Sequence, residues 1–427
     1  MEPQELHLTS PDTHYIFLGG YNEGYSGPIL GSVEITVPSS IHSSGYPNIK
    51  VALTRTVTST RKRPDTTYQY SCGLFKRIQK RNSIQDKSTP KSEQSSSSDT
   101  ETLSQCYLWH TPNDIQYNHD NNMARLKFNF AIPVHNKTPP TTETMLGSVS
   151  YAITAISTSI DGAKTTTSQP IQILRRAIPD FYRTIHHTRS FFDERVAVSL
   201  DLTPDESSAP DTKASYTGRL VAHRTIKPGR RPSERRHVVI KELRWRVEET
   251  VRVLSISGHG GTRDVKDECV RQLCDGSHSG HWSISKKLLK GEMAHDETIV
   301  VPFDIGIPRS ANVAEEMGIS AYSPDTKQPC RHDACECDTR TPTIDKRIVL
   351  SVSHRLRLDI IAGMDTIDQD TGRLVDRKPL WKLFGAFFCL PIHEFASPED
   401  IPDAAFLAND IPPMYEDGFQ PPSYKFE

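Results

Sequence analysis

The chain of 427 residues lacks long apolar runs, and only 35% of its residues are hydrophobic. Its longest uncharged apolar stretch, Leu383–Ile392, has ten residues and contains Pro391. A membrane-spanning helix needs about 20 such residues. The first ten residues show neither a basic region nor an apolar segment of the kind that begins a secretory signal. The sequence therefore predicts neither a membrane span nor secretion, and we expect a cytoplasmic protein.

The chain also lacks an excess of charge of either sign, with 51 Lys and Arg against 53 Asp and Glu. A protein that binds nucleic acid through its overall charge needs a basic excess, so we expect no nucleic-acid partner. Eight cysteines in a cytoplasmic chain are expected to be reduced thiols rather than disulfides.

Catalytic signatures are missing as well. The sequence has no phosphate-binding glycine loop followed by Lys and Ser or Thr, no Gly-x-Ser-x-Gly and no His-Glu-x-x-His. We therefore expect that the protein is not an enzyme and that it uses no cofactor.

One concentration of metal-binding residue types needs separate treatment. It consists of Cys269, Cys274, Cys330, Cys335 and Cys337, with His278, His281 and His332 nearby. Thiolate and imidazole groups suit zinc, but structural zinc sites favour short Cys-x(2–4)-Cys pairs, and the spacings here, Cys-x4-Cys and Cys-x4-Cys-x-Cys, are only loosely compatible with that pattern. We interpret these residues as two polar loops that carry thiols, with no metal, and keep a zinc site as the alternative.

What the sequence has instead is alternation with a period of two. From Arg347 to Ile361 the even positions are apolar and the odd positions are mostly polar, which predicts a strand with one buried face. His354 falls on the apolar face, and we expect a hydrogen-bonded core histidine there. From Lys241 to Ser255 the odd positions Leu243, Trp245, Val247, Val251 and Val253 share one apolar face, which predicts that Trp245 lies in a core and leaves Glu249 as the exception on that face.

Similar alternation recurs along the chain, and only Arg309–Gly318 is a helix candidate. Many amphipathic strands over two domain lengths predict an all-β fold of two antiparallel β-sandwiches in tandem. We place an N-terminal domain at Met1–Phe181 and a C-terminal domain at Tyr182–Phe395.

Three segments fall outside these predicted domains. The insertion from Arg61 to Gln105 begins basic and ends rich in serine, so we expect it to be disordered. A second insertion, about Gly258–Gly280, is rich in glycine, histidine and charge. Residues 396–427 are polar and rich in proline and acid, and we expect a disordered tail.

Within the first insertion the stretch Gly73–Arg81, GLFKRIQKR, mixes apolar and basic residues. As a helix it could lie on an anionic membrane surface through Lys76, Arg77, Lys80 and Arg81. The alternative interpretation is a solvated run of charge in a disordered loop.

The tail carries the pattern Pro-Pro-any-Tyr twice within thirteen residues. The two copies consist of Pro412, Pro413 and Tyr415, and of Pro421, Pro422 and Tyr424. A Pro-Pro pair favours the polyproline II conformation, which fits the aromatic groove of a WW domain, and the tyrosine fills an adjacent pocket. The nine residues from Tyr415 to Tyr424 span ~28 Å when extended, so tandem WW domains could bind both copies. These six residues are the predicted WW-binding site.

Several segments resemble the α-arrestins, in particular the arrestin-related trafficking adaptors of fungi. In the N-terminal half these are SGPILGSVEITV and FAIPVHNKTPPTTETMLGSVSYAITA. In the C-terminal half they are VVIKELRWRVEETVRV, SVSHRLRLDIIAG, TGRLVDRKPL and FCLPIHEF. The resemblance covers nearly the whole chain, is most specific in the C-terminal half, and is interrupted by residues 61–105.

The resemblance implies two linked arrestin-like β-sandwiches and a tail that recruits a HECT-type ubiquitin ligase through its WW domains. Such an adaptor directs ubiquitination and endocytosis of membrane transporters or receptors, and is recruited to the plasma membrane, endosomes or Golgi. Arrestin-like proteins also include signalling scaffolds that link a membrane sensor, for example of ambient pH, to endosomal sorting. This scaffold role is the first alternative, and a metal-dependent enzyme is the second.

Overall fold

The structure is a computed structural model that describes residues 5–19, 24–38, 48–60, 96–108, 114–118, 123–159, 162–179, 184–191, 196–205, 210–257, 262–284, 298–318, 347–397 and 399–401. The described residues form β-strands joined by turns, with a short 3-10 turn, η5 (Arg309–Ala311), and no α-helix. The predicted all-β class is confirmed. No helix among the described residues is long and apolar enough to cross a membrane.

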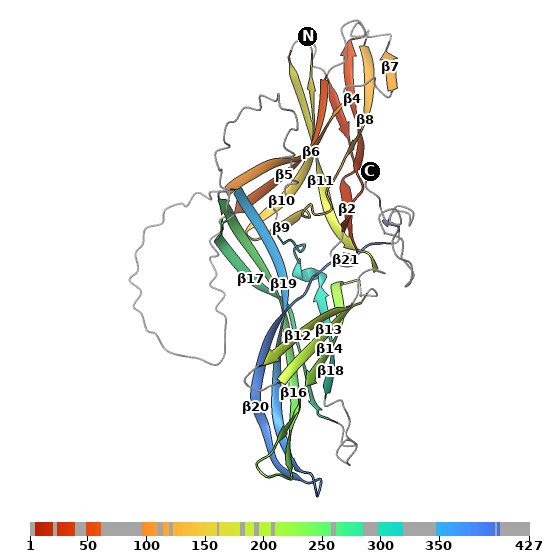
Figure 1. The fold of residues 1–427 in the computed structure, drawn as a ribbon. Coiled ribbons are helices and arrows are strands. Elements are labelled where there is room, and N and C mark those ends of the chain that lie inside the picture. The colour runs from red at the N-terminus through yellow and green to blue at the C-terminus, as the bar shows by residue number, and fades with distance from the viewer. Residues whose placement is uncertain are drawn as a thin grey trace, which may run out of the picture.

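Two sheets enclose the first core (Figure 1). The smaller sheet has the order β1 (Leu6–Thr9), β4 (Ile29–Pro38), β8 (Met123–Ile132), β7 (Asp114–Asn118). The larger has the order β3 (Gly24–Tyr25), β2 (Thr13–Leu18), β11 (Lys164–Ala177), β10 (Gly147–Thr158), β5 (Asn48–Thr60), β6 (Ser96–Leu108), with β9 (Thr142–Thr144) beside β10. Pairing is antiparallel, except that β2 and β21 (Glu394–Phe395) lie parallel to β11.

Two further sheets enclose the second core. One has the order β12 (Ile185–Phe191), β13 (Val196–Pro204), β14 (Thr212–His223), β18 (Ile299–Pro308). The other has the order β15 (Ile226–Pro228), β16 (Glu234–Ser257), β19 (Arg347–Asp368), β20 (Leu374–Cys389), with β17 (Thr262–Trp282) also beside β16. All the strand pairs in these two sheets are antiparallel.

Alternation in the sequence becomes alternation of burial in these strands. Along β19 the predicted even positions point into the cores, and Val352, Leu356 and Leu358 are fully buried. The odd positions between them are only partly buried, as a strand with one wet face requires. The predicted register of this strand is confirmed.

Trp245 lies on the predicted face of β16 but is only half-buried at the margin of the second core. Its ring packs against Phe303 with 5.3 Å between ring centroids. On the neighbouring strand it lies against Gly276, where any side chain would collide with the indole ring. The prediction is thus confirmed for the face, whereas the burial is less complete than expected.

The predicted disorder of residues 61–105 is wrong for its last ten residues. Ser96–Gln105 belong to β6, which pairs with β5 along its length, while residues 61–95 lie outside the described residues. A strand at the edge of a sheet needs few apolar side chains, and here Leu103 supplies one to the core. The inward carboxylate of Glu101 is neutralised by Arg55 at 2.7 Å, so a polar sequence can form this strand.

The second predicted insertion also contains a strand. Residues 262–282 form β17, an antiparallel partner of β16. The strand is hard to see in the sequence because most of its side chains are exposed or only partly buried, with Leu273 as the one buried side chain among those described.

The helix candidate Arg309–Gly318 is wrong. Only Arg309–Ala311 form a 3-10 turn, and Asn312 ends it in the left-handed conformation with φ of 46°. The chain then extends, and Met317 exchanges two backbone hydrogen bonds with Val352 of β19. We call residues 309–318 the junction segment.

The long strands β16 and β19 extend past the second core and contribute to the first one (Figure 1). On β16 Val247 belongs to the second core and Val251 to the first. On β19 Leu356 belongs to the second core and Val352 to the first. The predicted boundary between residues 181 and 182 therefore separates most strands of the two sandwiches. It does not separate the two cores, because residues after the boundary, such as Val251 and Val352, belong to the first core.

The predicted tail does not begin at Ala396. Its amide donates to the Ala177 carbonyl at 2.8 Å, and its side chain is buried against Phe17 and Ile178. Ile401 packs on the same small cluster. The chain therefore returns to the first sandwich after β20 and is again packed on it at Ile401.

Candidate functional site

The residues predicted to bind partners lie outside the described residues. They are Pro412, Pro413, Tyr415, Pro421, Pro422 and Tyr424 of the tail, and Lys76, Arg77, Lys80 and Arg81 of the insertion. The structure therefore places the root of the tail, within residues 394–401, but not the two motifs.

Two of the predicted thiols lie on a strand rather than in a loop. Cys269 and Cys274 are partly buried on β17, and burial raises the pKa of both thiols, that of Cys274 to about 11. Zinc binds thiolates, which such a shift disfavours. Within the described ranges no three His, Cys, Asp or Glu side chains are placed to hold a metal ion. Cys330, Cys335, Cys337 and His332 lie outside those ranges.

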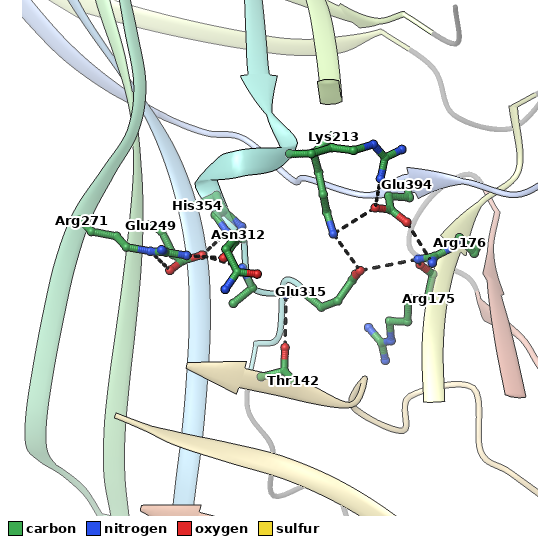
Figure 2. Close-up of polar contacts among 12 residues, drawn as sticks. Thr142, Arg175, Arg176, Lys213, Glu249, Arg271, Asn312, Glu315, His354 and Glu394 are labelled. Carbon is green, nitrogen blue, oxygen red and sulfur yellow. Dashed lines mark hydrogen bonds and ion pairs between the residues drawn. The ribbon is translucent and has the colours of Figure 1, made fainter. Parts of the chain in front are cut away.

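The most unusual described site is a set of charged groups where the two cores meet (Figure 2). We call it the polar junction and define it as Arg176, Lys213, Glu249, Arg271, Glu315, Glu316, His354 and Glu394. Glu249 and His354 stand directly opposite each other on β16 and β19. They occupy the point at which both strands pass from the second core to the first, so a buried polar pair marks the boundary between two apolar interiors.

Glu249 is 2% exposed and its carboxylate is held by three donors. Arg271 Nε donates at 2.5 Å and the Ala314 amide at 2.8 Å, and His354 Nε2 lies 3.4 Å away. Burial raises the pKa of Glu249, but the hydrogen bonds from His354, Arg271 and the Ala314 amide outweigh it, and the net pKa is lowered to about 2. Glu249 therefore remains a carboxylate in the folded protein at neutral pH.

Arg271 extends this contact to the junction segment. Its guanidinium donates to the carbonyls of Ala311 at 3.1 Å and Asn312 at 2.7 Å. The carbonyls at the end of η5 are thereby satisfied by a charged donor from β17, which fixes the turn against the sheet.

His354 is 1% exposed and lies between two carboxylates. Its Nε2 faces Glu249, and its Nδ1 lies 3.9 Å from Glu316 Oε2. Burial lowers the pKa of His354, but the hydrogen bond that its Nε2 makes to Glu249 and the attraction of the Glu249 and Glu316 carboxylates outweigh burial, so the net pKa is raised. The prediction of a hydrogen-bonded core histidine is confirmed.

A second group of charges lies across the junction segment from the first (Figure 2). Glu394 of β21 pairs with Arg176 at 2.9 Å and Lys213 at 3.2 Å, and Glu315 pairs with the same two cations at 3.6 and 3.4 Å. Arg309 also pairs with Glu394 at 3.2 Å. Burial raises the pKa of Glu394, but Lys213, Arg176 and Arg309 outweigh it and leave the pKa lowered.

These contacts join segments that are far apart in the sequence. Arg176 is on β11 of the first sandwich, Lys213 on β14 of the second, and Glu394 at the root of the tail. The Glu315 amide donates to Thr142 Oγ1 of β9 at 3.2 Å. The apolar side chains of the junction segment follow the same division, since Val313 enters the second core while Ala314 and Met317 enter the first.

The arrangement acts as a clasp. Breaking one partner of a buried ion pair leaves an uncompensated charge, so these pairs favour the placement of the two sandwiches in which they form. Part of this site was visible in the sequence, because His354 and Glu249 interrupt apolar faces. Nothing in the sequence pointed to Arg176, Lys213, Glu315 and Glu394, which lie near the ends of strands or in a connecting segment, where charge is usually solvated.

A scan of the chain against protein-family models finds no match, and a search among curated proteins finds none either.

Proposed function

We propose that this protein is an arrestin-like adaptor that recruits a WW-domain HECT-type ubiquitin ligase to membrane transporters or receptors and promotes their ubiquitination and endocytosis. The observation that carries the proposal is the pair of Pro-Pro-any-Tyr motifs within thirteen residues of a polar, acidic segment. Each motif offers a preformed polyproline II segment and a tyrosine for a WW groove.

The described fold supports the proposal without identifying a cargo. Two sandwiches of mostly antiparallel strands are consistent with the arrestin-like segments of the sequence. Ile401 is the last described residue and packs on the first sandwich, eleven residues before Pro412. Extended chain covers at most ~3.3–3.6 Å per residue, so the first motif lies within about 40 Å of Ile401 and a bound ligase stays close to the sandwiches.

The proposal also accounts for two motifs instead of one. Single WW contacts are weak, and a ligase with several WW domains gains up to ~10²-fold or more from simultaneous binding. Loss of one motif then removes both a contact and the gain from avidity.

Pull-down with a full-length HECT ligase tests this proposal. Tyr415→Ala and Tyr424→Ala should each weaken capture by more than they weaken binding to an isolated WW domain, and the double variant should abolish capture. Phe419→Ala is the matched control, because it removes an aromatic side chain between the motifs without touching either. Full capture by the double variant would contradict the proposal.

Proximity labelling from the intact protein, compared with a chain that ends at residue 401, would identify the cargo. Labelled transporters or receptors that depend on the tail together with a ligase support the adaptor role. Labelling of a membrane pH sensor and endosomal sorting proteins, without a ligase, would instead support a signalling scaffold.

A further inference from the structure

The polar junction and its border contain two histidines whose environments differ, the buried His354 and the partly buried His393. His354 lies between the carboxylates of Glu249 on β16 and Glu316 of the junction segment. His393, next to Glu394 of β21, is partly buried, and the charges that act on it are those of Glu316, Arg175, His354 and Lys213. One histidine is thus surrounded by carboxylates, and the other mostly by cations.

Backbone groups connect these side chains to two further elements of the clasp. The Ala314 amide of the junction segment donates to Glu249 Oε2 at 2.8 Å. The Ile392 amide, in the connection from β20 to β21, donates to Glu316 Oε2 at 3.2 Å, and the Leu390 amide donates to the His354 carbonyl at 3.2 Å. The charge on His354 therefore bears on both the junction segment and the chain that leads to the tail.

When His354 is protonated, one cation neutralises carboxylates from two different elements. Glu249 keeps Arg271 as a second cation at 2.5 Å, whereas Glu316 has only the histidine among the described ion pairs, and the Arg175 cation acts on it from beyond ion-pair distance. Loss of the proton therefore affects the Glu316 side of the site more, because a carboxylate is left facing a neutral ring and the nearby Glu249.

We propose that the polar junction is a proton-dependent clasp, closed when His354 is charged and loosened at the junction segment and at residues 390–393 when His354 becomes neutral. In the closed state the contacts of His354, Glu249 and Glu316 hold together β16, β19, the junction segment and the root of the tail. Loosening gives the tail root and the two sandwiches more freedom relative to each other. This regulation does not depend on the proposed adaptor function.

The direction of the effect follows from the pKa of each histidine. The pKa of His354 is raised above 6.5, so its contribution is complete below pH 6.5 and is lost as pH rises through the folded-state pKa. Burial and the cations Arg175, His354 and Lys213 lower the pKa of His393 to about 4 despite the attraction of Glu316. Its contribution is therefore lost as pH falls from 6.5 towards 4.

Hydrogen exchange of backbone amides, followed from pH 5.5 to 9 and corrected for intrinsic exchange, tests the proposal on the full chain. Protection at Ala314 and Ile392 should fall as pH rises, about tenfold for each unit by which the pKa of His354 is raised. Strand amides far from the junction, such as those of β4, should not show this dependence.

His354→Gln keeps a polar side chain without the charge. In this variant the protection of the Ala314 and Ile392 amides should no longer depend on pH. His393→Gln is the matched control, and in this variant the protection of the two amides should still fall as pH rises. Glu316→Gln provides a second variant if His354→Gln does not fold, since its side chain is 23% exposed, and it should remove the response at Ile392. Protection in the unmodified protein that does not change with pH, or an unchanged response in His354→Gln or Glu316→Gln, would overturn the proposal.

Discussion

Two ion pairs bridge the same neighbouring strands, β16 and β17, and their surroundings differ. Glu249 and Arg271 face each other at the polar junction, where the glutamate side chain is 2% exposed. Arg252 and Glu268, three residues further along each strand, face each other on the surface with side chains 43% and 41% exposed. Strand pairing, residue types and charge are thus matched, and burial is the main variable.

The comparison shows what burial changes in such a pair. The exposed pair is solvated whether or not it forms, so its net contribution is small. The buried carboxylate also accepts from the Ala314 amide and faces His354, and it cannot return to water without opening the junction. Its importance lies in the cost of leaving one member alone, more than in the energy of the intact pair.

The largest effect is expected for Glu249→Gln. This substitution leaves Arg271 and His354 without their carboxylate and should reduce the free energy of unfolding by ~3–5 kcal/mol. Urea unfolding measures the loss, and Glu268→Gln on the surface is the matched control. A loss under ~1 kcal/mol, typical of exposed pairs, would show that the junction is hydrated and that the comparison fails.

A somewhat smaller loss is expected from truncation in an apolar core. Leu356 is fully buried in the second core, two residues from His354 on the same strand. Leu356→Ala should cost ~2–5 kcal/mol through lost burial and a residual cavity. The same unfolding experiment shows whether the polar junction is as sensitive as the apolar interior beside it. A cost near zero would mean that this face of β19 is not packed as described.

The next prediction concerns the stability of the protein at acidic pH. The pKa of His393 is lowered to about 4 in the folded protein. As pH falls below 6.5, this histidine therefore becomes protonated in the unfolded chain while it stays neutral in the folded one. Between pH 7 and pH 5 this histidine should therefore remove about 2 kcal/mol of stability. His393→Gln should be less sensitive to that change in pH by the same amount. Equal pH dependence of the two proteins would show that His393 is solvated.

The smallest effect is expected on the surface. Arg252→Met keeps the aliphatic stem but removes the charge opposite Glu268, and should change stability by ~0.2–1 kcal/mol at most. Added salt should erase even that difference, because exposed charges are screened. A larger loss, insensitive to salt, would place this pair in the same class as Glu249 and Arg271.

The strand pattern could be predicted from the sequence because one wet and one buried face impose a period of two on β16 and β19. The same argument failed for β6 and β17, which lie at sheet edges and leave most of their side chains exposed or only partly buried. Their stability comes from backbone pairing with a neighbour, which leaves little trace in the hydrophobic pattern.

Only part of the polar junction could be predicted from the sequence. Glu249 and His354 stood out because each interrupts an apolar face, but their direct pairing requires the strand register. Glu315 lay in a stretch whose spacing favoured a helix, whereas the structure has a 3-10 turn that ends at the left-handed Asn312 and a β-bridge at Met317. Arg176, Lys213 and Glu394 come from three distant elements, so no local pattern could bring them together.

Paired double-mutant cycles test the central claim most directly, that burial at the junction makes a strand-to-strand ion pair into a clasp. One cycle combines Glu249→Gln with Arg271→Met, and the other combines Glu268→Gln with Arg252→Met. The structure predicts a coupling free energy of ~1–3 kcal/mol for the first pair and below ~0.5 kcal/mol for the second. Equal couplings, or a larger value for the surface pair, would contradict it.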